Sequence, residues 1–520
     1  MTRPPNVVWI MTDQHRADAM GCAGNPVIRT PHFDRLAAEG TRFDRCYITN
    51  PVCQPSRGSL FTGRYPHAHG SWKNGVELPR SEVTIADALA RRGYATGVVG
   101  KIHLANTSTK YRPGKPMPPT SMHRNKGIPE AEVSQFWRTW YGPHYGFQHC
   151  ELAIAHGNRV AGGGHYGEWL REHHPEAVDL MEPEHALAPP TGAIQSWKSA
   201  IPAELHYDTW VAERSIAYLE AQRRQPDRPF LLYCSFPDPH RPLCPPAPYC
   251  DMYDPNDMPL RTPNRGEFER MPPHHQLRYV GRDREIPYAP TGIQGPSSGK
   301  ADLSQLPEAH LREMMAHYYG SVSLVDASIG RVLDALDRLG LSEDTIVLYC
   351  SDHGELMGDH GLIFKGPFHY ESMIRTPLIW RWPGVVPPGR TYEHVTSTVD
   401  IMPALLEACD VPPEPGVQGE SMLPALRGDD RPYREWALVE HREEPQGMQT
   451  KTLVTERYKV TYYPGHPFGE LFDLHDDPQE YDNLWDVPAH RPLRSELLQQ
   501  LLEALCRTED PLPEPTGSGG

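Results

Sequence analysis

The chain has 520 residues and a mass of 58.7 kDa, which is enough for one large domain and a smaller one. It carries 51 Lys and Arg against 67 Asp and Glu, a formal net charge of −16. This acidic balance argues against a protein that binds nucleic acid. An anionic substrate would require positive charge to be concentrated in a pocket.

The sequence contains no candidate membrane segment. No stretch approaches the roughly 20 apolar residues of a span, and the apolar run at 7–11 is too short for a signal peptide. The ten cysteines form no CxxC pair and show no metal-type spacing. Most are therefore expected to be buried thiols in a reducing compartment, and we expect a cytoplasmic protein with no membrane partner.

Apolar runs rich in β-branched residues predict buried strands, each followed by a polar cluster and then a helix. In chain order, strands are predicted at 5–11, 43–49, 94–99, 229–236, 345–350 and 377–380. Helices are predicted at 30–37, 57–62, 84–92, 207–222, 311–339 and 399–408. This alternation indicates an α/β fold with a doubly wound sheet and helices on both faces.

Ligands bind beyond the carboxyl ends of the strands in such sheets. Several polar residues follow predicted strands directly, although they are hundreds of positions apart in the chain. We expect these residues to converge on one rim of the sheet: Asp13, Lys101, His240, Asp352 and His353.

The remaining segments are less regular. A stretch at about 105–200, rich in Pro, Gly and His, reads as long loops or an inserted lid, and 241–300 is also loop-rich. After about residue 430 the pattern changes to antiparallel strands and a terminal helix. The predicted organisation is a catalytic α/β domain at 1–430, a small α+β domain at 431–510 and a disordered tail at 511–520.

Two polar pairs have the chemistry of metal ligands. Asp13-Gln14 and Asp352-His353 supply carboxylates, an amide oxygen and an imidazole. Hard oxygen ligands with one nitrogen suit Ca²⁺, Mg²⁺ or Mn²⁺, and the nitrogen tilts slightly toward Mn²⁺. Taken singly, each pair could equally cap the loop or helix that follows it.

A set of basic residues has the chemistry of an oxyanion site. A tetrahedral oxyanion requires cations around its oxygens and an acid for the leaving group. Taken singly, each of these residues could be a solvated surface group. The set consists of Arg57, Lys101, His103, His240 and Lys365.

Five spaced motifs resemble signatures of the type I, formylglycine-dependent sulfatases of the alkaline phosphatase superfamily. Residues 53–57 (CQPSR) are similar to the C-x-P-S-R signature, and 93–103 (GYATGVVGKIH) to the second signature. The others are 239–242 (PHRP), 351–354 (SDHG) and 364–371, with FKG followed by YE. They occur in the family's order, and the C-terminal strands resemble its small domain. The resemblance implies an alkaline-phosphatase-like sandwich with a large, mixed, mostly parallel sheet flanked by helices.

The resemblance also implies a role for Cys53. In the family a separate maturation enzyme oxidises this cysteine to Cα-formylglycine, which hydrates to a gem-diol. One diol oxygen attacks the ester, and the second lets the covalent sulfo-enzyme intermediate collapse by elimination. The implied activity is hydrolysis of aryl or alkyl sulfate monoesters. Read without the family, Cys53 could be a buried thiol or a thiol nucleophile.

The family's site residues carry over position by position. The implied ligands of one divalent metal ion, Ca²⁺ or Mn²⁺, are Asp13, Gln14, Asp352, His353 and modified Cys53. The other implied roles are to polarise the diol (Arg57), bind the sulfate oxygens (Lys101, Lys365), protonate the leaving alcohol (His240) and trigger elimination (His103).

Two positions depart from the pattern of many sulfatases and indicate a branch of the family. Gln14 and His353 replace the common Asp and Asn, as in the arylsulfatase-like, choline-sulfatase and phosphonate monoester hydrolase branches. Asn74 lies where the phosphonate branch places a substrate-binding Asn. That branch typically lacks the Lys and His present here as Lys101 and His103. Sulfate esters are therefore favoured, with phosphonate monoesters or phosphodiesters as the alternative or as promiscuous substrates.

Other features leave alternatives open. A non-catalytic relative would have lost a site residue, and none is lost here. Members of these branches are often dimers or tetramers, so we expect a homo-oligomer. Aromatic residues of the 105–200 segment could face a ring or sugar, although packing is the simpler reading: Trp137, Trp140, Tyr141, Trp169 and Trp197.

Overall fold

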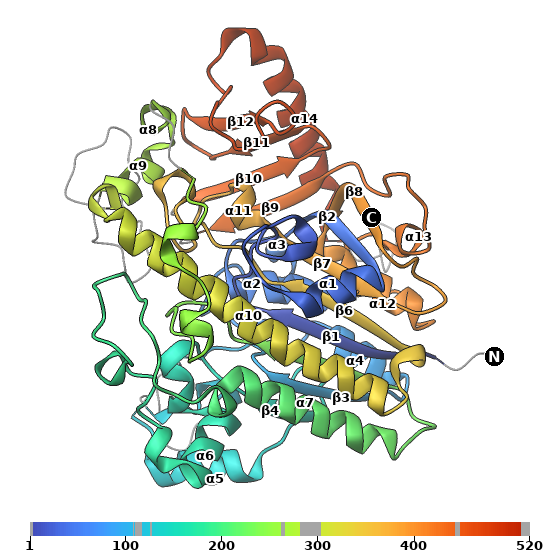
Figure 1. Ribbon diagram of the computed structural model, residues 1–520. Helices are drawn as coiled ribbons and strands as arrows, with labels where there is room; N and C mark the ends of the chain where they lie inside the picture. Colours follow the sequence, from blue (N-terminus) through green and yellow to red (C-terminus); the bar gives the residue numbers. More distant parts are fainter. Residues whose placement is uncertain are drawn as a thin grey trace.

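The computed structural model describes residues 4–107, 109, 117–124, 127–261, 266–280, 303–442 and 448–510. Two sheets and the helices around them make up the fold (Figure 1). The strands are β1 (Asn6–Thr12), β2 (Thr41–Tyr47), β3 (Ala95–Gly100), β4 (His149–Leu152), β5 (Phe230–Phe236), β6 (Thr345–Ser351), β7 (Arg375–Arg381), β8 (Arg390–Ser397), β9 (Ala437–Arg442), β10 (Gln449–Val454), β11 (Tyr458–Tyr462) and β12 (Gly469–Asp473).

The α-helices range from single turns to one long helix that crosses the sheet. They are α1 (Pro31–Ala38), α2 (Cys53–Thr62), α3 (Pro66–His69), α4 (Ile85–Arg91), α5 (Glu130–Thr139), α6 (Gly164–His173), α7 (Tyr207–Arg223), α8 (Glu267–Arg270), α9 (Pro273–Val280), α10 (Glu308–Arg338), α11 (Glu371–Ile374), α12 (Ile401–Ala408), α13 (Leu423–Leu426) and α14 (Arg491–Arg507).

The large sheet has the strand order β4-β3-β5-β1-β6-β7-β2-β8. Neighbouring strands pair in parallel, except that β7 runs antiparallel to both β6 and β2. All residues of β1, β5 and β6 are buried, as expected for strands covered on both faces. The structure confirms the predicted mixed, mostly parallel sheet with flanking helices.

The two faces of the sheet form two separate cores. Val8 and Ile10 of β1 pack in one core with α1, α7 and α10, and the last two helices cross the front of the sheet in Figure 1. Val7, Trp9 and Met11 point to the opposite face and pack with α2, α4 and α12. This alternation follows the two-residue period of a strand, so β1 is fixed from both sides.

A second, antiparallel sheet has the order β12-β11-β10-β9 and is covered by α14. Its core joins Leu438 and Leu453 of the sheet to Leu497 and Leu501 of the helix, and it also includes Tyr65 from the first part of the chain. The structure therefore confirms a smaller α+β unit packed on the large one. The boundary near residue 430 stays a prediction, and the tail at 511–520 lies outside the described residues.

An ion pair links the two units. The buried Glu440 of β9 accepts hydrogen bonds from the backbone N–H of His67, at 2.8 Å, and from its Nδ1, at 3.1 Å. Burial raises the pKa of Glu440, but Lys451 and His67 outweigh it and hold the pKa at about 2. Burial lowers the pKa of His67, but the bond to Glu440 leaves it raised overall. This pair ties α3 to the small sheet.

The segment at 105–200 is more regular than its sequence pattern indicated. It contains α5 and α6, and β4 extends the large sheet as an edge strand. β4 has four residues, of which His149 and Glu151 are polar. It therefore lacks the apolar run that revealed the longer strands.

Helix α2 also begins earlier than predicted, at Cys53 rather than at Arg57. Pro55 lies in its first turn, where the absent backbone N–H has no partner to lose. Every residue of α2 is buried. Cys53 is thereby fixed at the N-terminus of a helix packed inside the molecule.

The ten cysteines all lie in described residues, form no disulfide, and eight of them are buried. Along the described parts of the chain, none of the helices has both the length and the apolar character that crossing a bilayer requires.

Candidate active site

The carboxyl ends of β1 and β6 bring the two polar pairs together. Thr12 pairs with Ser351, so Asp13 and Asp352 are the next residues on adjacent parallel strands. Gln14 has φ of +70°, and its backbone N–H donates to Asp352 Oδ1 at 3.1 Å. The sequence prediction that these distant residues meet at one rim is confirmed.

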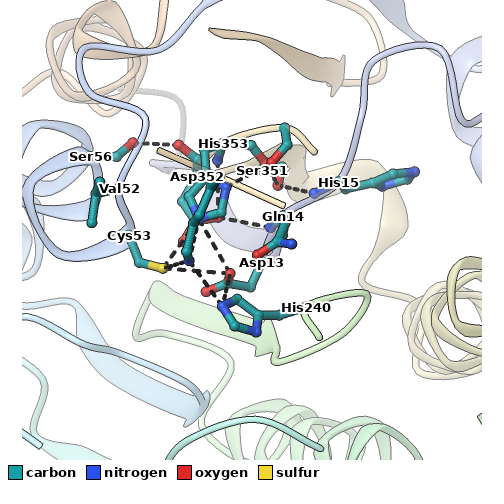
Figure 2. A network of polar contacts seen from close by, with 12 residues as sticks. Asp13, Gln14, His15, Val52, Cys53, Ser56, His240, Ser351, Asp352 and His353 are labelled. Atoms are coloured by element: carbon teal, nitrogen blue, oxygen red, sulfur yellow. Dashed lines mark hydrogen bonds and ion pairs between the residues drawn. The ribbon is translucent and has the colours of Figure 1, made fainter. Parts of the chain in front are cut away.

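Cys53 lies directly opposite these pairs (Figure 2). Its Sγ is 3.2 Å from His353 Nε2 and 3.7 Å from Asp13 Oδ1, and Lys365 Nζ is at 2.7 Å. Burial and the Asp13 carboxylate raise the pKa of the Cys53 thiol. The nearby cations, led by Lys365, outweigh both and hold that pKa well below its usual range.

Arg57, one turn further along α2, is fully buried and holds the two carboxylates. Its Nε donates to Asp352 Oδ2 at 2.8 Å, and its Nη2 to Asp13 Oδ2 at 3.1 Å. Its Nη1 donates to the Lys101 carbonyl, the Tyr233 hydroxyl and Ser235 Oγ. These contacts give Arg57 a role behind the carboxylates, and its expected contact with a diol at position 53 stays a prediction.

The pKa values of the two carboxyls shift in opposite directions. Burial raises the pKa of Asp13, but the surrounding cations, led by Lys101, hold it well below its usual range. Burial and the neighbouring Asp13 charge raise the pKa of Asp352 to about 6. Two carboxylates this close repel each other, so a cation between them is favoured.

The donor set fits a divalent metal ion. Ligand atoms of Asp13, Cys53, Asp352 and His353 all lie within 4.8 Å of one another. His353 Nδ1 donates to the Gly354 carbonyl at 2.9 Å, which leaves the Nε2 lone pair facing the site. This oxygen-rich set with one imidazole matches hard divalent ions.

Gln14 adds an observation of its own. Its side-chain Nε2 donates to Glu355, while its buried Oε1 has no hydrogen-bond partner among the described residues. A buried carbonyl oxygen without a partner is costly, and coordination of a metal ion would satisfy it.

Lys365 and His240 lie on the other side of Cys53. Lys365 Nζ donates to His240 Nε2 at 2.9 Å and to His353 Nε2 at 3.0 Å. His240 Nδ1 donates to the Arg241 carbonyl, so its Nε2 faces the site and lies 4.0 Å from Asp13 Oδ1. Burial and the Lys365 charge lower the pKa of His240 to about 3.

His156 is a site residue that the sequence reasoning missed. Its ring stacks on His240 with centroids 3.5 Å apart, and its Nε2 contacts Lys101 Nζ, which also donates to Asp13. It follows β4, as the other polar residues follow their strands. Recognising His149–Leu152 as a strand would therefore have pointed to it.

A cavity of about 350 Å³ opens beside this cluster. Its lining includes both Lys101 and His103, together with His123, His156 and Arg159. Burial lowers the pKa of His103. The cavity thus lies next to Lys101 and His156 of the cluster.

Asn74 lies outside that lining. Its Oδ1 accepts from the backbone N–H of Gln54 at 3.0 Å, and the residue is exposed. The structure thus gives Asn74 a contact that holds the start of α2. Its substrate-binding role stays a prediction.

The aromatic candidates of the 105–200 segment also lie outside the cavity lining. Trp137 is buried and forms a ring cluster with Phe136, Trp140 and His165, whereas Tyr141 is exposed. These contacts match the packing reading.

Comparison with known proteins identifies the family. The sulfatase family profile matches residues 5–411, and the profile for the C-terminal region of N-sulphoglucosamine sulphohydrolase matches 358–507. The chain belongs to the sulfatase family, within the alkaline phosphatase superfamily. With the site above, this makes the protein a sulfuric ester hydrolase.

Three relatives place it more closely. It is 30% identical to an arylsulfatase of Clostridium perfringens over 505 residues, covering 96% of this chain and 93% of the relative. It is 26% identical to a choline-sulfatase of Rhizobium meliloti, covering 94% and 83%. The crystal structure of a phosphonate monoester hydrolase of Agrobacterium radiobacter superposes with a TM-score of 0.79 at 28% identity, covering 97% and 96%.

Proposed function

We propose that the protein hydrolyses aryl or alkyl sulfate monoesters with a formylglycine derived from Cys53. The observation that carries this is the position of Cys53 Sγ, within 3.7 Å of Asp13, His353 and Lys365 at once. A nucleophile at this position touches both the metal ligands and a cation that can bind the ester. A cysteine that only packs in the core does not require metal ligands and a lysine around its sulfur.

Two groups from outside the coded side chains supply part of the chemistry. Formylglycine, when hydrated, supplies the nucleophilic hydroxyl. A divalent ion held by Asp13, Gln14, Asp352 and His353 supplies Lewis-acid activation of that hydroxyl and of the ester. Ca²⁺ and Mn²⁺ both suit these donors.

The chain's own residues position the ester and move protons. Lys101 and Lys365 both act electrostatically on position 53, and they bind the sulfate oxygens. His240 Nε2 accepts from Lys365 Nζ, so it takes a proton from Lys365 and passes it to the leaving oxygen. His103 lines the cavity and takes a proton when the site is regenerated.

The test begins with maturation. The protein is co-expressed with a formylglycine-generating enzyme, and the tryptic peptide containing Cys53 is examined by mass spectrometry. We expect the mass of the aldehyde or its hydrate, and hydrolysis of 4-nitrophenyl sulfate. Cys53→Ala should lower kcat/KM by about 10³-fold or more. Full activity with Cys53 still a thiol would contradict the proposal.

The second candidate is a phosphonate monoester or phosphodiester hydrolase. The structural likeness to the Agrobacterium radiobacter enzyme favours it. Comparing kcat/KM for 4-nitrophenyl sulfate and 4-nitrophenyl phenylphosphonate on the same preparation decides between them, since both release the same phenol. A preference for the phosphonate would replace the first proposal with the second.

A further inference from the structure

Arg241 is a buried cation without a described counter-charge. The residue is 8% exposed, and its Nη1 has no hydrogen-bond partner among the described residues. No ion pair with Arg241 occurs within the described ranges. Its guanidinium lies over the ring of Phe364, 4.3 Å from the centroid.

The acidic side chain whose charge acts on Arg241, Glu355, already has other hydrogen-bond donors. Glu355 accepts from the backbone N–H groups of Met357, at 2.9 Å, and Phe364, and from the Gln14 side chain. Burial accordingly lowers the pKa of Arg241, against the weaker opposing effect of Glu355. An unpaired buried guanidinium is unfavourable unless an anion reaches it from outside the chain.

Arg241 belongs to a segment that packs against the cavity-lining residues His156 and Arg159. Arg241 follows His240, whose ring stacks on His156. A Cβ added at Gly157 would lie 2.6 Å from Pro242. The segments 156–159 and 240–242 are therefore packed directly against each other.

Arg159 belongs to the first of these segments. It lines the cavity and is exposed, and within the described chain no carboxylate pairs with it. Its charge also acts on Arg241. Two arginines without a carboxylate partner among the described residues thus lie in the two segments that meet at His240.

The other cations of the site are engaged differently. Arg57 pairs with Asp13 and Asp352, and Lys101 with Asp13. Together with Lys365 beside Cys53, they account for the metal ligands and the reacting sulfate. A single sulfate ester therefore leaves Arg241 and Arg159 without an anion.

We propose that Arg241 and Arg159 form a subsite for a second oxyanion, a carboxylate or sulfate carried by the alcohol that leaves. The substrate class is then a sulfate ester with a further anionic group, rather than a neutral or cationic alcohol. This inference rests on the proposed function, because it places the leaving group in the cavity next to His240.

The first test compares matched substrates. Phenyl sulfates bearing a meta or para carboxylate are compared with the corresponding carboxamides, which have nearly the same shape and no charge. We expect wild type to prefer one of the carboxylates about tenfold or more in kcat/KM, in line with couplings measured for close charge pairs. Arg241→Gln and Arg159→Gln should each reduce this ratio, whereas the exposed Arg92→Gln should leave it unchanged.

The ratio separates selectivity from any general loss of activity. Arg159 is exposed, so its variant provides the test even where Arg241→Gln does not fold. Arg241→Lys should retain part of the preference, because it keeps the charge without the planar fork. A wild-type ratio near one, or a ratio that neither arginine variant changes, would overturn the proposal.

A binding measurement needs no turnover. Calorimetry compares benzene-1,3- and 1,4-disulfonate with benzenesulfonate on the metal-loaded protein. Tighter binding of a disulfonate that is lost in both arginine variants supports the subsite, even if no sulfate ester is hydrolysed; in that case the proposed function alone fails. Hydrolysis of both substrate types with equal binding of both ligands would mean that the function stands and the subsite does not.

Discussion

The two sides of the active site differ in whether their arginines are paired with carboxylates. On the metal side, Arg57 is fully buried and bonded to both Asp13 and Asp352. On the leaving-group side, Arg241 and Arg159 have no carboxylate partner among the described residues. Paired charges hold the geometry of the site before substrate binds, whereas unpaired charges are available to an anion from solution. Arginine thus holds the carboxylates in place on the metal side, and in the proposed subsite it would bind an anion of the substrate.

Removing a carboxylate from the metal side should have the largest effect. Asp13 contacts Arg57, Lys101 and the proposed ion. We expect Asp13→Asn to lower kcat/KM for 4-nitrophenyl sulfate by about 10³-fold or more and to reduce the bound metal measured by mass spectrometry. Asp334→Asn, at an exposed ion pair, is the control. Full metal content in Asp13→Asn would show that the metal ion binds elsewhere.

Replacing Arg57, which pairs with both carboxylates, should give the next largest effect, a loss of stability. Arg57→Gln leaves the buried Asp352 without its arginine partner and leaves Asp13 with Lys101 alone, at a cost of about 3–5 kcal/mol in the free energy of unfolding. Urea denaturation in the presence of a chelator measures this. Arg57→Lys should recover part of the loss, since it restores charge but not the fork. A loss below about 1 kcal/mol would show that the pairing contributes little.

The unpaired arginine should behave differently. Arg241→Gln removes a buried charge that has no described partner, and it also removes the contact with Phe364, a cation–π interaction of about 0.5–2 kcal/mol. These terms oppose each other, so we expect the free energy of unfolding to stay within about 1 kcal/mol of wild type or to rise. A loss as large as that of Arg57→Gln would abolish the contrast between the two sides.

The smallest effect tests pairing away from the site, at His67 and Glu440. The folded pKa of Glu440 is about 2 against an ordinary 4.5, so its contribution is present above pH 4.5 and is lost as the pH falls toward 2. The pKa of His67 is raised above 6.5, so its contribution is present below pH 6.5 and is lost as the pH rises through the raised value.

The two contributions overlap between about pH 4.5 and 6.5. We expect the Tm of wild type to exceed that of His67→Gln by most in that window, by an amount that corresponds to about 1 kcal/mol or less, and the difference to shrink toward alkaline pH. A difference independent of pH would mean that His67 acts through packing alone.

The fold was predictable where burial leaves a simple mark on the sequence. β1, β5 and β6 are continuous apolar runs because both faces of the sheet are covered. Their polar successors therefore identified the rim that holds Asp13 and Asp352. β4 was missed because an edge strand of four residues needs no apolar run, and His156 was missed with it.

Other features depend on contacts that no local pattern encodes. That Arg57 faces the carboxylates from behind, and that Asn74 holds the backbone of Gln54, follow from the packing of α2. That Arg241 has no ion-pair partner among the described residues likewise depends on all the segments around it. The sequence identifies the candidate charged residues of the site, but it does not show which of them remain unpaired in the fold.

The burial of Cys53 limits when the proposed modification can occur. In the folded protein Cys53 has no exposed surface, so an enzyme that acts on its side chain must reach it while the chain is still open. The site closes with Lys365, which lies 312 positions later. At a synthesis rate of 5–20 residues per second, that separation gives about 15–60 s. If Cys53 is modified as proposed, the length of chain between Cys53 and Lys365 sets the time available for that modification.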